Sequence, residues 1–234
     1  MKYTAIIFDV GDTLLEHYPK QEQIYLERMR TVGINVDDSA ADMIMTAFNK
    51  AYHEQILKEQ NGALRMPDAE FLYMLDKAVV NCFVSDDNES DYLDKLQAIP
   101  LPELKLVLIS GAVETLTALK EKGYRMAIVS NHRKWLPDYL TEIDLSGFFE
   151  TIVVSDIVGI SKPDIRIMQI ALDELKLDPS ECLYVGDHPF DVLCAKNAGI
   201  DCAWIASPDS ILPDSVPYKE DYRINNINEL EKIL

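Results

Sequence analysis

The segment Ile6–Leu15 has the sequence IIFDVGDTLL, in which an apolar run leads directly into an aspartate, a glycine and a second acid. A short apolar run bounded by turn residues predicts a buried parallel strand, here from Ala5 to Phe8, with Asp9 at its carboxyl end. Ligands of open α/β sheets bind at that edge of the sheet. A carboxylate there can be a metal ligand, a nucleophile or a general base. The segment alone also fits an aspartate that only caps a turn.

Composition narrows the class of protein. The chain has 234 residues, enough for one large domain or for a core with a smaller domain. Its 48% apolar and 26% charged residues are typical of soluble globular proteins. The formal net charge of −18 argues against partners such as nucleic acid or an anionic membrane, because acidic proteins repel phosphate backbones. We find no stretch with the features of a signal peptide or the length of a membrane span.

Cysteine usage favours a cytoplasmic location. The cysteines show neither CxxC nor Cys/His zinc spacing, so we expect buried, reduced thiols of the kind found in the cytosol. They are Cys82, Cys182, Cys194 and Cys202.

After Leu15 the apolar residues recur at helical spacing until Ser110. Gly33 is placed to end a first helix, and Pro67 with Asp68 is placed to open a third. Four helices can enclose a core of their own, so we predict a helical cap over residues 18–101. Residues 1–17 and 102–234 then form the α/β core. The alternative is that these helices are an arm of that core.

From Ser110 onward, helix and strand patterns alternate, which predicts a doubly wound, mostly parallel sheet with helices on both faces, a Rossmann-like core. The expected strands are 125–129, 151–154, 182–185, 202–205 and 222–224. The expected helices are 113–122, 135–143, one opened by Pro163 with Ile165, Met168, Leu172 and Leu175 on its core face, one from Pro189 to Gly199, and 227–234.

Polar residues gather where these strands end. Asp9, Ser130 and Asp187 each stand at or just after the end of a predicted strand. Parallel strands bring those ends to one edge of the sheet, so residues far apart in sequence meet there. Lys162 lies on a loop before a helix, from which its side chain can reach the same edge.

Four segments carry these residues: DVGDT at 9–13, AIVSN at 127–131, SKPD at 161–164 and GDHPFD at 186–191. By the order and type of these four segments, the chain resembles the haloacid dehalogenase-like hydrolase superfamily, in the subgroup with a helical cap inserted just after the first strand. The corresponding family patterns are DxDxT, an apolar strand ending in Ser/Thr-Asn, a lysine usually followed by proline, and GDxxxD. The resemblance covers the whole chain, cap included.

The resemblance implies phosphoryl transfer assisted by magnesium. Asp9 would attack phosphorus and form an aspartyl-phosphate that water then hydrolyses. Mg²⁺ would offset the repulsion between this carboxylate and an anionic substrate. Its expected ligands are the carboxylates of Asp9 and Asp187 and the carbonyl of Gly11. Asp191 would act as a further ligand or support the others.

The remaining motif residues would hold the phosphoryl group. By resemblance Lys162 would bind its oxygens and offset the charge of Asp9. The hydroxyl of Ser130 and the backbone amide of Asn131 would donate hydrogen bonds to the same oxygens. The implied partner is a small phosphorylated metabolite, while the exact substrate and the oligomeric state are left open by the sequence.

One departure from the family pattern bears on the reaction. Most phosphatases of this family have a second aspartate two positions after the nucleophile, as general acid and then base, where this chain has Gly11 followed by Asp12. We therefore keep three readings: a metabolite phosphatase, a metal-independent 2-haloacid dehalogenase, and a catalytically weak phosphometabolite-binding module. In the first reading, either Asp12 replaces the missing general acid or the leaving group departs without an acid to protonate it. We favour the second alternative.

Overall fold

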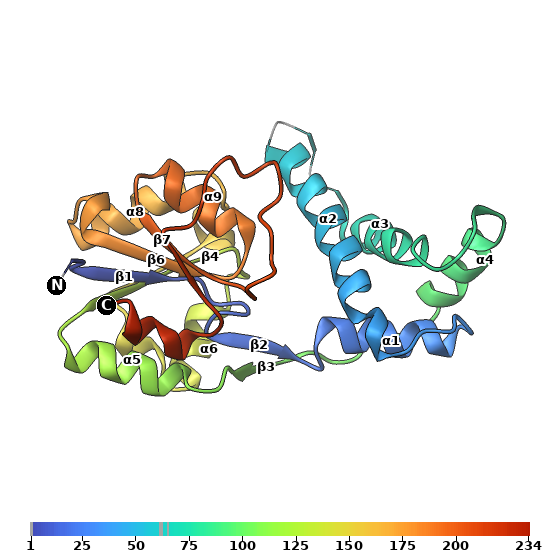
Figure 1. Ribbon diagram of the computed structural model, residues 1–234, viewed down its shortest axis with the longest axis horizontal. Helices are drawn as coiled ribbons and strands as arrows, with labels where there is room; N and C mark the ends of the chain where they lie inside the picture. The colour runs from blue at the N-terminus through green and yellow to red at the C-terminus, as the bar shows by residue number, and fades with distance from the viewer. Residues whose placement is uncertain (1, 61–62, 65) are drawn as a thin grey trace. The chain divides into compact units, whose positions relative to one another are not determined.

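The computed structural model describes residues 2–60, 63–64 and 66–234 (Figure 1). The chain divides into two compact units. Met1–Glu16 and Leu106–Leu234 make up the first, which we call the α/β unit, and His17–Lys105 makes up the second, which we call the helical unit. The roles of core and cap for these units stay predictions.

Among the described residues, six parallel strands form the sheet of the α/β unit. Across the sheet they are β5 (Thr151–Val154), β4 (Arg125–Ser130), β1 (Ala5–Phe8), β6 (Cys182–Gly186), β7 (Asp201–Ile205) and β8 (Tyr222–Ile224). β1 is central, and Phe8 is in register with Ile128 of β4 and Val185 of β6. The α/β class with a mostly parallel sheet, expected from the alternation, is confirmed.

Helices cover both faces of this sheet, with α5 and α6 on one face and α8 and α9 on the other (Figure 1). The side chains of β1 alternate between the two cores: Ile6 and Phe8 pack in one, Ala5 and Ile7 in the other. The helices and turns of this unit are α5 (Ala112–Glu121), α6 (Leu136–Glu142), η2 (Ser146–Phe148), α7 (Ser155–Val158), α8 (Arg166–Leu175), η3 (Pro179–Glu181), α9 (Pro189–Asn197) and η4 (Ile227–Lys232).

The helical unit has its own buried core, to which α1, α2, α3 and α4 all contribute. Its elements are α1 (Gln21–Thr31), η1 (Asp38–Ala40), α2 (Ala41–Gln60), α3 (Asp68–Val80) and α4 (Asp86–Gln97). Gly33 follows α1 with a φ of 90°, a conformation that favours glycine. The side chain of Asp37 accepts a hydrogen bond from the amide of Ser39 and so caps η1. None of the helices within the described residues is long and apolar enough to cross a membrane.

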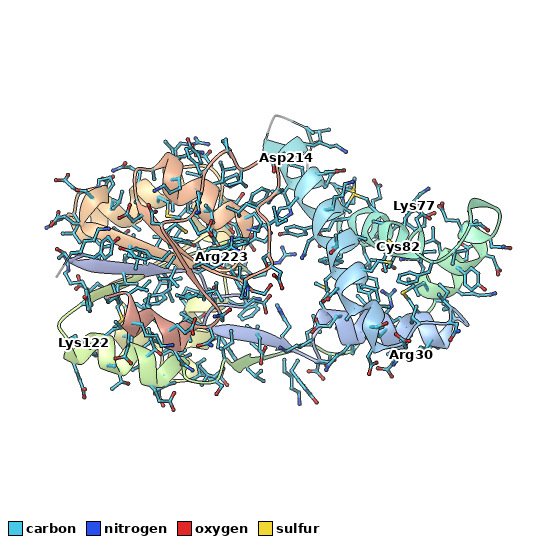
Figure 2. All side chains as sticks on the ribbon, in the orientation of Figure 1. Arg30, Lys77, Cys82, Lys122, Asp214 and Arg223 are labelled. Atoms are coloured by element: carbon cyan, nitrogen blue, oxygen red, sulfur yellow. The ribbon has the colours of Figure 1, made fainter. Side chains whose placement is uncertain are left out.

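The structure corrects four details of the sequence-based prediction. Leu15–Tyr18 (β2) and Lys105–Leu108 (β3) form a two-stranded sheet that the helical pattern did not predict. Ile165 is 46% exposed, because α8 begins only at Arg166, and Ile167 is buried in its place. The last helix is a 3₁₀ segment rather than an α-helix. Cys82, labelled in Figure 2, is exposed, whereas the other three cysteines are buried.

A buried ion pair ties the helices of this unit together. The guanidinium of Arg28 in α1 donates to both carboxylate oxygens of Asp76 in α3, at 2.9 and 3.0 Å, and to the carbonyl of Leu96 in α4, at 3.1 Å. Tyr25 donates its hydroxyl to the same carboxylate, at 2.9 Å. Burial and the neighbouring Asp76 raise the pKa of Tyr25, which keeps its donated proton in place. Asp76 is fully buried and Arg28 nearly so, and each side chain supplies the opposite charge that offsets the cost of burying the other.

We predict that Asp76→Ala lowers the free energy of unfolding by about 3–5 kcal/mol, because it leaves the buried charge of Arg28 without the carboxylate that balances it. The matched control is Lys77→Ala on the same helix, since the pair of Lys77 with Glu89 is half-exposed on the lysine side. This control should cost less than about 1 kcal/mol. Urea unfolding followed by circular dichroism measures both, and equal losses would contradict the assigned role of the buried pair.

Candidate active site

Three of the predicted residues stand at the carboxyl edge of the central strands. The backbone amide of Asp9 continues the pairing of β1 and donates to the carbonyl of Val185 at 2.9 Å. Asp187 directly follows β6, and Ser130 is the last residue of β4. Asp9 and Ser130 are buried, at 7% and 1% exposure, whereas Asp187 is half-buried. The parallel topology therefore places these side chains along one edge, as expected from the ends of the strands.

The ammonium of Lys162 lies between two carboxylates. Its Nζ donates to Oδ1 of Asp9 at 2.8 Å, to Oδ1 of Asp191 at 2.6 Å and to the hydroxyl of Tyr184 at 2.9 Å. The residue is only 3% exposed. Burial acts to lower the pKa of Lys162, but the charges of Asp191 and Asp9 outweigh it and raise the pKa, so the side chain is cationic.

Asn131 holds the backbone of Lys162 rather than offering its side chain to a ligand. The side-chain oxygen of Asn131 accepts from the amide of Lys162 at 2.7 Å, and its side-chain nitrogen donates to the carbonyl of Lys162 at 3.0 Å. The paired bonds fix the loop that carries the lysine. This contact was not part of the sequence-based expectation, which concerned the backbone amide of Asn131.

Both carboxylate oxygens of Asp191 already accept hydrogen bonds. Oδ1 accepts from Lys162, and Oδ2 accepts from the amide of His188 at 2.9 Å, which closes the first turn of α9. A Cβ at Gly186 would collide with this carboxylate, so the glycine before Asp187 is needed for steric reasons. Asp191 therefore serves both as a helix cap and as a counter-charge of Lys162, and the sequence-based expectation did not include this contact with the lysine.

Tyr184 is the site residue that the sequence analysis missed. Its hydroxyl accepts from Lys162 and lies 2.9 Å from the carbonyl of Val129 and 3.0 Å from Oδ1 of Asp191. Burial, followed by the charge of Asp191, raises its pKa far above the usual value, so the phenol stays protonated. A tyrosine in an otherwise apolar buried strand was the available signal, because a buried hydroxyl needs a hydrogen-bond partner.

Oxygen atoms of Asp9, Asp187 and Asp191 all lie within 4.8 Å of one another. Burial raises the pKa of Asp187 well above its usual value, and the charges of Asp191 and Asp9 add to the shift. One lysine cannot balance three carboxylates. A set of hard oxygen donors with excess negative charge fits a divalent cation such as Mg²⁺.

The structure leaves room at Gly11. A Cβ added there would meet no atom within 4 Å, so a larger side chain is compatible with the fold. Asp12 is exposed and has a φ of 49°, in the left-handed region that aspartate tolerates better than most residues. Its amide donates to the carbonyl of Leu15 at 2.7 Å, which fixes the turn after Asp9.

A sequence profile of the haloacid dehalogenase-like hydrolase family matches residues 6–205. The chain belongs to this family. It is 28% identical to the haloacid dehalogenase-like hydrolase domain-containing protein 3 of Xenopus laevis, over 83% of this chain and 80% of that protein. It is 27% identical to the glyceraldehyde 3-phosphate phosphatase of Pyrococcus furiosus, over 98% of this chain and 92% of the relative.

The fold is also shared with solved structures. A dehalogenase in an intermediate complex superposes with a TM-score of 0.68, at 22% identity, covering 100% of this chain and 97% of the other. At that identity the likeness concerns the fold alone. The chain is thus a haloacid dehalogenase-like hydrolase, as its four motifs suggested.

We predict that Mg²⁺ raises the melting temperature more at about pH 8 than at about pH 5, because protons compete with the metal for carboxylates. Unfolded aspartates ionise near pH 4, whereas the pKa of Asp187 is raised in the folded protein. Without metal, the contribution of this group to stability is therefore greatest below about pH 4 and falls as the pH rises through the raised pKa.

Thermal unfolding with and without saturating Mg²⁺ at the two pH values measures this effect. Asp187→Asn is the control, because a neutral side chain removes both the pH dependence of this group and its attraction for the cation. An equal rise in melting temperature at both pH values in the unmodified protein would show that Asp187 is not the titrating ligand.

Proposed function

We propose that this protein is a cytoplasmic, magnesium-dependent phosphatase of small phosphorylated metabolites that acts through an aspartyl-phosphate on Asp9. The observation that carries the proposal is the ammonium of Lys162, which is held between Asp9 and Asp191, two of the three members of the acidic cluster. A cation fixed next to a nucleophilic carboxylate is what attack on an anionic phosphoryl group requires. The four cysteines, all within the described residues, are free thiols, which supports a reducing compartment.

Asp9 is the proposed nucleophile because it directly follows the central strand and lies beside a fixed cation. It stands at the open edge of the central strand and remains 7% exposed, so one oxygen can face a substrate while Oδ1 is held by Lys162. The hydroxyl of Ser130 and the backbone amide of Asn131, from the end of the neighbouring strand, would donate to the phosphoryl oxygens. Lys162 would share its charge between Asp9 and the transferred group.

The proposed magnesium ligands are Asp9, Asp187 and the carbonyl of Gly11. Bound Mg²⁺ supplies positive charge that neutralises the phosphoryl oxygens. Asp191 would support the site without binding the metal, because both of its carboxylate oxygens already accept hydrogen bonds, from Lys162 and from the amide of His188. Its part is then to orient Lys162 and to complete the charge balance of the cluster.

The substrate class follows from relatives and from the helical unit. The relative from Pyrococcus furiosus is named a glyceraldehyde 3-phosphate phosphatase, which supports a small phosphorylated metabolite as substrate. We propose that residues 18–101 act as the cap that selects it, since a unit with its own core can present a separate set of side chains. We propose neither nucleic acid nor a membrane as a partner.

The second candidate is a 2-haloacid dehalogenase, which the lack of an aspartate at position 11 favours. Halide leaves without protonation, so such an enzyme needs no acid at this position. The acidic cluster weighs against it, because displacement of halide at carbon does not require the divalent cation that such a cluster suits. The two candidates therefore differ in their metal dependence and in the bond that is broken.

We expect hydrolysis of p-nitrophenyl phosphate that requires Mg²⁺ and stops in EDTA, with no chloride released from 2-chloropropionate. Asp9→Asn should lower the phosphatase rate by more than about 100-fold, about 2.7 kcal/mol of barrier, because the amide is a poor nucleophile. Its melting temperature, measured alongside, shows that the variant is folded. Chloride release in EDTA would show that the enzyme is a dehalogenase instead. If no chloride is released and no compound in a broad screen of phosphorylated metabolites is hydrolysed, the protein is a binding module.

The glycine at position 11 predicts a preference for good leaving groups. General acid catalysis is worth about 100- to 10,000-fold, and alkyl phosphates need it most. We expect Gly11→Asp, for which the structure has space, to speed alkyl phosphate hydrolysis by about tenfold or more and aryl phosphate hydrolysis much less. Asp12→Ala is the matched variant and should have little effect on either. A collapse of alkyl phosphate hydrolysis in folded Asp12→Ala would instead identify Asp12 as the acid.

A further inference from the structure

A row of three residues runs across the sheet to the acidic cluster. Gly186 of β6 is in register with Trp204 of β7, and Trp204 is in register with Arg223 of β8. Asp187, the proposed magnesium ligand, directly follows Gly186. Arg223 is labelled in Figure 2, and β8 is the last strand of the sheet.

Trp204 touches the backbone of Asp187. The indole Nε1–H donates to the carbonyl of Asp187 at 2.6 Å, and the side chain is only 4% exposed. An indole N–H is a donor only, so this buried bond has one direction. The carbonyl belongs to the residue whose carboxylate joins the acidic cluster, and holding it limits rotation of the turn between β6 and α9.

Arg223 holds the indole in turn. Its Cζ lies 4.8 Å from the centroid of the Trp204 ring, a cation–π arrangement. The guanidinium is itself fixed, because Nε donates to Glu220 at 2.7 Å and Nη1 donates to the carbonyls of Pro208 and Ser210, at 3.0 and 2.9 Å. A planar group with several fixed donors cannot slide over the ring as a lysine can.

We propose that Trp204 is a positioning residue for the magnesium ligand Asp187, and that Arg223 holds Trp204 in the orientation that this role needs. Arg223 lies beyond residues 6–205, the part of the chain that the family profile matches, so this support comes from the chain's own C-terminal segment. The inference rests on the proposed function, in which Asp187 binds the metal. Partners that orient a metal ligand are typically worth about 10- to 100-fold in metal affinity.

The test is calorimetric titration of the substrate-free protein with Mg²⁺. Trp204→Phe keeps an aromatic ring but lacks the N–H donor, and we expect it to raise the Kd for Mg²⁺ by about tenfold. Arg223→Lys keeps the charge but loses the planar fork, and we expect a smaller rise of about threefold. With saturating Mg²⁺, kcat and the KM for p-nitrophenyl phosphate should return to within about twofold of the unmodified protein, because only the metal affinity is changed.

Trp135→Phe is the matched control, since Trp135, which directly precedes α6 and is 45% exposed, packs its ring on His132 and Tyr139. It should leave Mg²⁺ binding unchanged. Normal Mg²⁺ affinity in folded Trp204→Phe would overturn the inference. If that variant does not fold, Arg223→Lys decides: an unchanged Kd refutes the proposal, and a raised Kd supports it.

Asp187→Asn separates the two proposals. If it abolishes Mg²⁺ binding while Trp204→Phe binds normally, only the positioning role fails. If Asp187→Asn itself binds Mg²⁺ with normal affinity, Asp187 is not the ligand, and both the metal site and the inference built on it are refuted.

Discussion

The buried ammonium of Lys162 is the interaction on which the site depends. Removing a charge from water costs several kcal/mol, and two carboxylates and a phenol offset that cost here. Asp9, Lys162 and Asp191 come from three distant segments, so the lysine links the end of β1, the loop before α8 and the first turn of α9. The arrangement is possible because β1 lies beside β6 in a parallel sheet, which brings the first and fourth motifs to adjacent strand ends.

The sequence predicted the sheet and the convergence of its strand ends because both follow from local patterns. Apolar runs set β1, β5 and β6, and Asp9 and Asp187 come directly after two of them. What it missed depends on contacts across the fold. The short β2 and β3 form a two-stranded sheet and carry no strong period, and the bond from Asn131 to the loop of Lys162 joins segments 31 positions apart. The roles of Tyr184 and Trp204 likewise appear only once the strands are in register.

Two glycines of the motifs, Gly11 and Gly186, differ in the space that surrounds them. Gly186 has no space for a side chain because the carboxylate of Asp191 occupies it, whereas Gly11 faces open space. The first is thus dictated by packing, and the second reflects no steric need of the fold. Packing therefore does not explain Gly11, and only under the proposed function does it bear on the chemistry of the site, a distinction that spacing along the chain cannot make.

The three buried clusters of the protein are separate, and the one built from α1 to α4 lies wholly within the helical unit. Substitutions at positions that share no neighbours have effects on stability that add rather than interact. Substitutions within the buried cluster of the helical unit are therefore expected to leave the other two clusters unchanged. Under the proposed function, the core of the helical unit could therefore change in sequence while the residues around Lys162 stay the same.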